Sequence, residues 1–214
     1  MSNHYPFLKL LPTIGILLFF ALYIYAASLY PGGSQADVNS IGFEWRDNYW
    51  CNLMSAEAMN GEVNPGSPVA LLGMVVLCSS MTLFFVQFAN YFEDNIRWRR
   101  IIKIAGALGM FSAIFIFTQY HDIMTTLLSI CGTVGLIGII RALHKNDLTF
   151  FKASGLLCMV VIGVNNFFYY NESLIKYLPV IQKIAFILIL SWTIALNLRM
   201  MKKPSLSDSH YSTP

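Results

Sequence analysis

Six long apolar stretches constrain this chain more than any other feature of its sequence. A helix that crosses a bilayer needs about 20 mostly apolar residues, because lipid cannot satisfy exposed backbone N–H and C=O groups. The stretches run from Phe7 to Leu29, Pro68 to Phe92, Ile101 to Thr118, Ile123 to Leu143, Ala153 to Tyr169 and Pro179 to Arg199. The sequence therefore predicts an all-α fold, a polytopic membrane bundle of six transmembrane helices within one domain over residues 1–203.

The composition agrees with this interpretation. Only 12% of the 214 residues are charged, whereas a soluble domain carries about 25%. The net charge of +3 is too small an excess to indicate nucleic acid as a partner. We find no acidic residue in the middle of any span, which argues against a proton-coupled pump or transporter of the usual design.

The first stretch could instead be a secretory signal peptide, because Ala26, Ala27 and Ser28 form a passable cleavage site. A signal peptide, however, has an apolar region of only about 7–15 residues. The run in this chain is longer, so the sequence favours a retained transmembrane helix.

The distribution of basic residues predicts the orientation. With the N-terminus in the cytoplasm, eleven Lys and Arg residues fall inside and three fall outside. The three outside are Arg46, Lys176 and Lys183. By the positive-inside rule we expect both termini to be cytoplasmic, in a plasma membrane or a bacterial inner membrane, with a disordered tail over residues 204–214.

The third and fourth spans are separated by only about four residues, Gln119 to Asp122, and are expected to be antiparallel neighbours. Small residues recur on both spans, which lets helix backbones approach closely in lipid. They are Ala105, Gly109 and Ala113 on the third, and Gly132, Gly135 and Gly138 on the fourth.

Residues 30–67 form the only long connection, and it holds five of the eleven acidic residues. A structureless loop of this length is uncommon in a compact protein. Asp47 can cap a helix and Gly61 can end it, which predicts a short interfacial helix from Asn48 to Asn60. We expect its aromatic residues to lie at the level of the lipid headgroups, as a lid on the outer side of the bundle.

Polar residues of this loop and of the outer span ends could line one outward-facing pocket. Lys183 would have to snorkel to water, face a wet cavity, or pair with an acid such as Glu172, Asp122 or an acid of the long loop. The simpler alternatives are helix-to-helix hydrogen bonds for the asparagines and an exposed turn for the His–Asp pair. The candidate ligand-binding residues are Glu44, Asp47, Asn48, Glu57, His121, Asp122, Asn165, Asn166 and Lys183.

A pocket that is half wet and half apolar suits a lipid or a small amphipathic ligand, and this is the leading functional hypothesis. The first alternative is a structural or assembly subunit that recruits a membrane protein partner, or a second copy of itself, through the outer loop. The second is a lipid hydrolase or transferase, although no nucleophile and base can be identified by spacing. No metal or cofactor motif occurs, and the four cysteines lack a C-x-x-C spacing, so we expect no metal, cofactor or disulfide framework.

Two short motifs follow the first span, Tyr30-Pro31-Gly32-Gly33-Ser34 and Asn39-Ser40-Ile41-Gly42. Together with the order of spans, they resemble six-helix membrane proteins that include the damage-regulated autophagy modulators, the fibroblast-growth-factor-receptor-activating proteins and related bacterial families of unknown function. The resemblance implies a six-span protein with a lipid-linked or assembly role. It implies no catalytic set, so it assigns a function to no individual residue.

Overall fold

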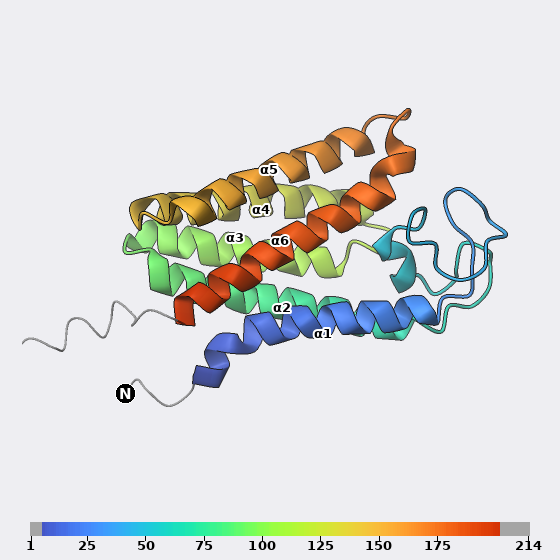
Figure 1. Ribbon diagram of the computed structural model, residues 1–214, viewed down its shortest axis with the longest axis horizontal. Coiled ribbons are helices and arrows are strands. Elements are labelled where there is room, and N and C mark those ends of the chain that lie inside the picture. Colours follow the sequence, from blue (N-terminus) through green and yellow to red (C-terminus); the bar gives the residue numbers. More distant parts are fainter. Residues whose placement is uncertain (1–5, 202–214) are drawn as a thin grey trace, which may run out of the picture. The chain divides into compact units, whose positions relative to one another are not determined.

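The computed structural model describes residues 6–201, and in this range it contains six α-helices and no named β-strand (Figure 1). Two short 3-10 helices complete the regular structure, η1 (Trp50–Met54) and η2 (Ile175–Tyr177). The disordered tail expected over residues 204–214 lies outside the described residues. The α-helices are α1 (Pro6–Ser28), α2 (Ser67–Phe92), α3 (Ile96–Ile114), α4 (His121–Lys145), α5 (Thr149–Tyr169) and α6 (Leu178–Met201).

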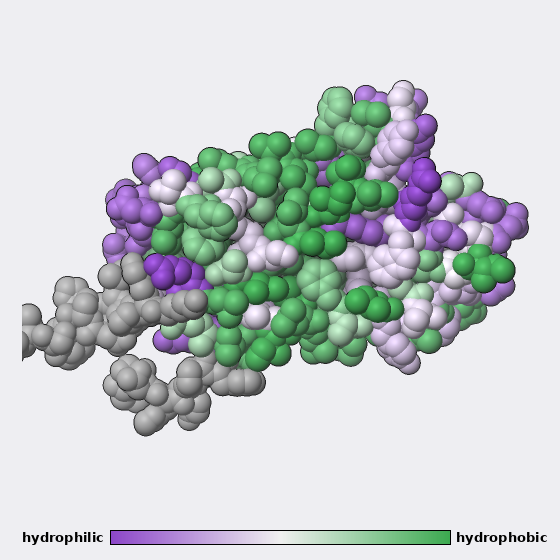
Figure 2. Space-filling model, viewed as in Figure 1, coloured by the Kyte–Doolittle hydropathy of each residue, from purple (hydrophilic) through white to green (hydrophobic). Residues whose placement is uncertain are grey.

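Within the described residues, five helical segments are long and apolar enough to cross a membrane. They are Leu8–Ser28, Ser67–Phe92, His121–Lys145, Thr149–Tyr169 and Ile175–Met201. Figure 2 shows hydrophobic residues over the helix surfaces and hydrophilic residues gathered in loops and at helix ends. Large apolar side chains such as Leu17 and Val160 are more than half exposed, as expected for helices that face lipid.

The helix α3 differs from the other five because its first two turns contain Arg97, Arg99, Arg100 and Lys103. It begins five residues before the predicted Ile101 and ends four residues before Thr118. The side chain of Asn95 accepts hydrogen bonds from the backbone N–H groups of Arg97 and Trp98. This N-cap satisfies two of the free donors at the helix start, so the helix begins among the charged residues.

The chain divides into two compact units. Of the described residues, the first unit contains 6–16, 78–155 and 191–201, and therefore includes α3 and α4 entirely. The second contains residues 17–77 and 156–190, and therefore includes the long loop between α1 and α2.

In the first unit, α3 and α4 lie side by side (Figure 1). Small residues make the close approach possible, as predicted: a Cβ on Gly138 would lie 2.5 Å from Ile102, and a Cβ on Gly109 would lie 3.4 Å from Cys131. Gly132, which was predicted to take part, has no neighbour within 4 Å of such a Cβ among the described residues.

A polar network in the first unit surrounds Pro12, which lies inside α1. Proline has no N–H, so the carbonyl of Leu8 loses its usual helical partner. The side-chain amide of Gln87 donates to this carbonyl at 3.0 Å. The fully buried Asn197 donates to the carbonyl of Lys9 at 3.0 Å and accepts from the hydroxyl of Thr13 at 2.7 Å. Gln87 of α2 thus satisfies the carbonyl that the proline leaves free, and Asn197 of α6 adds hydrogen bonds to the adjacent turn of α1.

Candidate functional site

The long loop of residues 30–66 is held by main-chain contacts and not by the helix predicted from Asn48 to Asn60. That prediction was wrong in type and extent, because only Trp50–Met54 is helical, and as a 3-10 helix. Isolated antiparallel bridges join Gly32 to Ile41 and Glu57 to Val63. The second bridge, between residues six positions apart, keeps the latter part of the predicted helix extended.

Two glycines allow distant parts of this loop to touch. Gly33 has a φ of +82°, which L side chains rarely adopt, and a Cβ there would overlap the backbone nitrogen of Asn60. A Cβ on Gly32 would overlap the carbonyl oxygen of Ser40. The N–H of Gly33 donates to that same carbonyl at 2.8 Å. The Gly-Gly pair therefore brings the two motifs and the segment around Asn60 together.

Trp50 anchors the loop to the helices of the second unit. Its ring centroid lies 5.9 Å from that of Phe19, 5.7 Å from that of Tyr23 and 5.3 Å from that of Phe186. Its backbone N–H donates to the side chain of Gln182 at 3.1 Å. Aromatic packing of this kind contributes stability beyond the burial of apolar area. Trp50 is 6% exposed and is thus buried among the side chains of the second unit.

Lys183 is 8% exposed, so it does not snorkel. Its ammonium donates to the main-chain carbonyl of Asn48 at 2.5 Å and to that of Pro179 at 3.0 Å, and it lies 5.7 Å from the ring centre of Phe43. Among residues 6–201 no carboxylate forms a salt bridge with it. The ammonium group is therefore stabilised by main-chain carbonyls, an arrangement that was not predicted from the sequence.

Asn48 is fully buried and joins three parts of the loop. Its side chain accepts from the N–H of Glu44 and donates to the carbonyl of Gly33, both at 2.8 Å, while its own carbonyl accepts from Lys183. Two of the predicted site residues, Asn48 and Lys183, are thus in contact. Their contacts hold the loop in place.

Of the other predicted site residues, Glu44 contacts this pair, through the hydrogen bond from its backbone N–H to the side chain of Asn48. Glu44, Glu57 and Asn166 are exposed, Asp47 is partly exposed, and the side-chain oxygen of Asn165 is buried without a hydrogen-bond partner among residues 6–201.

His121 and Asp122 belong to the first unit. Their side chains lie 3.0 Å apart and both are exposed. This matches the simpler interpretation of an exposed pair at the turn. Their participation in a common pocket with the loop stays a prediction.

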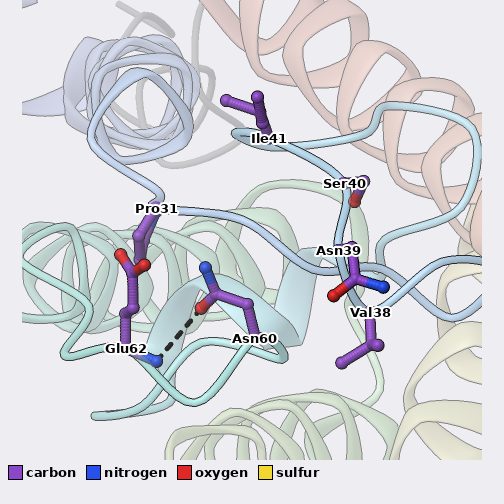
Figure 3. Close-up of a pocket in the computed structure, with 7 residues that line it drawn as sticks. All are labelled: Pro31, Val38, Asn39, Ser40, Ile41, Asn60 and Glu62. Carbon is purple, nitrogen blue, oxygen red and sulfur yellow. Dashed lines mark hydrogen bonds between the residues drawn. The ribbon is translucent and has the colours of Figure 1, made fainter.

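The loop contains a hollow of about 420 Å³ that none of the predicted residues lines. We call it the loop hollow, and its lining residues are Pro31, Val38, Asn39, Ser40, Ile41, Asn60 and Glu62. Figure 3 shows Val38, Asn39 and Ser40 on one segment of the loop, with Asn60 and Glu62 on another.

Both polar and apolar groups face the loop hollow. The amide oxygen of Asn60 accepts from the backbone N–H of Glu62 at 3.1 Å (Figure 3). The hydroxyl of Ser40 is buried and has no hydrogen-bond partner among the described residues. Ile41 is 92% exposed and Val38 is 55% exposed. An ordered loop thus presents bare aliphatic side chains beside amides and a carboxylate.

Burial disfavours the charged forms of two titratable residues of the loop region, Cys51 and Tyr30. Burial raises the pKa of the Cys51 thiol, although the charge of Lys183 acts in the opposite direction, so its reactive thiolate form is disfavoured. Burial also raises the pKa of Tyr30, whose hydroxyl oxygen accepts from the N–H of Met59 at 3.0 Å. Within residues 6–201, no three His, Cys, Asp or Glu residues are grouped so that they could hold a metal ion.

Four residues that line the loop hollow were not predicted from the sequence as site residues: Asn39, Ser40, Asn60 and Glu62. A signal was present, because the two motifs that carry the family resemblance contribute four of the seven lining residues. The chain matches no protein-family model, and no curated protein or solved structure is significantly similar to it.

Proposed function

We propose that this chain is a six-span membrane protein that binds the polar group of a lipid or lipid-like amphipathic ligand in the loop hollow, on the non-cytoplasmic side. The observation that carries the proposal is the exposure of Ile41, at 92%, beside a hollow lined by Asn39, Asn60 and Glu62. Ligand pockets characteristically combine apolar walls with a few convergent polar groups.

The length of α3 supports the proposal that this helix crosses the membrane in addition to the other five. Its 19 residues extend about 28 Å at 1.5 Å per residue, close to the thickness of the hydrocarbon core. Its basic residues all lie in the first two turns, from which long cationic side chains can snorkel to the headgroups. With six spans and a cytoplasmic N-terminus, that end of α3 is cytoplasmic, in agreement with the positive-inside rule.

The lining residues of the loop hollow favour a ligand with hydroxyl or amine donors. The carboxylate of Glu62 accepts hydrogen bonds, and the amides of Asn39 and Asn60 can both donate and accept. Val38 and Ile41 offer aliphatic surface to an adjoining apolar segment. A lipid headgroup with its first acyl carbons has this combination.

A second candidate is an assembly subunit that recruits a membrane protein through the loop. Ile41 and Val63 favour it, because they are 92% and 79% exposed. Both residues belong to the long loop, and exposed apolar surface can mark a protein interface.

Native mass spectrometry of the protein released from nanodiscs of phosphatidylcholine and phosphatidylethanolamine separates the two candidates. Glu62→Gln is the test variant, and Glu57→Gln is its control, because Glu57 is an exposed acid of the same loop that does not line the hollow. Loss of a charged hydrogen bond worth about 1.5–3 kcal/mol should reduce lipid retention roughly tenfold or more. Equal retention by Glu62→Gln and wild type would contradict ligand binding at the hollow. Loss of a co-purifying protein in Ile41→Ser, with lipid retention unchanged in both Glu variants, would favour the assembly role.

The orientation has its own test. Ile41→Cys places a thiol at a nearly fully exposed position, and wild type controls for the four native cysteines. In sealed right-side-out vesicles, a membrane-impermeant maleimide should label the Ile41→Cys protein without permeabilisation. Labelling that requires permeabilisation would place the loop in the cytoplasm and overturn the proposed orientation.

A further inference from the structure

A buried carboxylate holds two turns of the first unit together. Glu93, which follows α2, is 0% exposed and forms an ion pair with Arg141 near the end of α4. Lys145 lies 3.7 Å from the same carboxylate. The side chain of Asn146 donates to the carbonyl of Phe92 at 2.9 Å. The α2–α3 turn and the α4–α5 turn are therefore direct neighbours.

These two turns and the first residues of α3 and α5 form what we call the two-turn surface, residues 93–103 and 141–152. It contains seven Lys and Arg residues against three acids, and one of those acids, Glu93, is buried and already neutralised by Arg141. The basic residues are Arg97, Arg99, Arg100, Lys103, Arg141, Lys145 and Lys152. The charge that reaches solvent is therefore strongly positive.

Some of these cations already interact with other groups of the protein. The guanidinium of Arg99 donates to the carbonyl of Glu93 at 2.8 Å, and that of Arg141 lies 5.1 Å from the ring centre of Trp98. Arg97 and Arg100 are exposed, and Lys152 is partly exposed. No salt bridge is formed by these three within the described chain. Their charge is available to an external anion.

We propose that the two-turn surface binds the headgroups of anionic phospholipids in the leaflet that it faces. The positive charge of this surface complements the negative charge of such headgroups, because clusters of four to eight Lys and Arg next to membrane helices attract anionic lipids. The inference rests on the membrane placement proposed above but not on the loop hollow. A failure of one site therefore leaves the other unaffected.

The test compares nanodiscs of pure phosphatidylcholine with nanodiscs that also contain phosphatidylglycerol. Native mass spectrometry should find phosphatidylglycerol enriched on the wild-type protein over its share of the bilayer, and the enrichment should fall as salt rises. In the triple variant Arg97→Gln, Arg100→Gln, Lys152→Gln, the enrichment should be lost. From about 1 kcal/mol per cation at a membrane surface, each single change should weaken retention on the order of fivefold.

The matched control is the double variant Arg46→Gln, Lys176→Gln. Both residues are exposed cations of the second unit, so this variant lowers the net charge without touching the two-turn surface. It should retain phosphatidylglycerol as wild type does. Equal loss in test and control variants would show a non-specific charge effect and overturn the proposal, as would unchanged retention in the triple variant. If the triple variant unfolds, the single variants Arg97→Gln and Arg100→Gln decide in the same way.

Discussion

The side-chain ammonium of Lys183 donates a hydrogen bond to the main-chain carbonyl of Asn48, with 2.5 Å between the two atoms and 135 residues between them in the chain. This contact joins the start of α6 to the middle of the long loop. Because both residues are buried, neither group can exchange its partner for water without opening the loop. The contact explains how a segment with so little regular structure keeps one conformation.

Lys183→Met should loosen the loop. The substitution leaves the buried carbonyl of Asn48 without this donor, which costs about 1–3 kcal/mol. We expect a lower melting temperature in detergent and faster proteolysis within residues 30–66. Lys176→Met, at an exposed cation on η2, should leave both unchanged. Proteolysis of Lys183→Met at the wild-type rate would contradict the anchoring role.

Gly33→Ala should destabilise the loop more than Gly61→Ala. Both glycines have a φ near +80°, at +82° and +83°, so each substitution incurs a backbone strain of about 1–2 kcal/mol. Only at Gly33 would the new Cβ also overlap a backbone atom, that of Asn60. The free energy of unfolding should therefore be lower in Gly33→Ala than in Gly61→Ala by about 1 kcal/mol or more, the usual cost of overpacking. Equal melting temperatures would mean that the loop shifts freely at this crossing.

Glu93→Gln should remove a contribution to the free energy of unfolding that depends on pH. Burial of the carboxylate raises its pKa, but hydrogen bonds from the N–H of Asn95 and from Arg141, with the charges of Arg141 and Lys145, more than offset this, so the folded pKa lies below the ordinary 4.5. A lowered folded pKa gives stability that is present above pH 4.5 and is lost as pH falls through the folded value.

The measurement is the melting temperature of the detergent-solubilised protein between about pH 7 and pH 3. At neutral pH, Glu93→Gln should cost about 1–3 kcal/mol, because it leaves Arg141 without its anionic partner. Its melting temperature should then fall less steeply with acid than that of wild type. Asp94→Asn, at the exposed neighbouring acid, should follow the wild-type curve. Parallel curves for Glu93→Gln and wild type would exclude this linkage.

The role of Gln87 should depend on Pro12. In wild type, Gln87→Leu removes the donor to the carbonyl of Leu8 and should cost about 1 kcal/mol, near the values measured for hydrogen bonds between membrane helices. In a Pro12→Ala background, the backbone N–H restored at residue 12 can bond to that carbonyl, so the cost of Gln87→Leu should fall. A double-mutant cycle on unfolding in mixed micelles measures the coupling. A coupling energy of zero would show that Gln87 does not compensate for the proline.

The helices could be predicted from the sequence because apolar length is a local property. The predicted span from Pro68 to Phe92 differs by one residue from α2 (Ser67–Phe92), and the span from Pro179 to Arg199 differs little from α6 (Leu178–Met201). The least accurate prediction was α3, whose charged first turns do not look like a membrane span. There the Asn95 cap, a local signal that the hydropathy pattern ignores, fixes the start.

The conformation of the loop and the candidate site could not be predicted in this way. The amino-acid sequence was enough to predict where long apolar helices form, that small residues such as Gly109 and Gly138 allow α3 and α4 to pack, and that the basic residues gather between particular helices. Tertiary packing was needed to bring the ammonium of Lys183 to the carbonyl of Asn48 and to place the exposed Ile41 with Glu62 at the loop hollow. These outcomes depend on which main-chain donors and acceptors meet across large sequence separations, and no window of neighbouring residues contains that information.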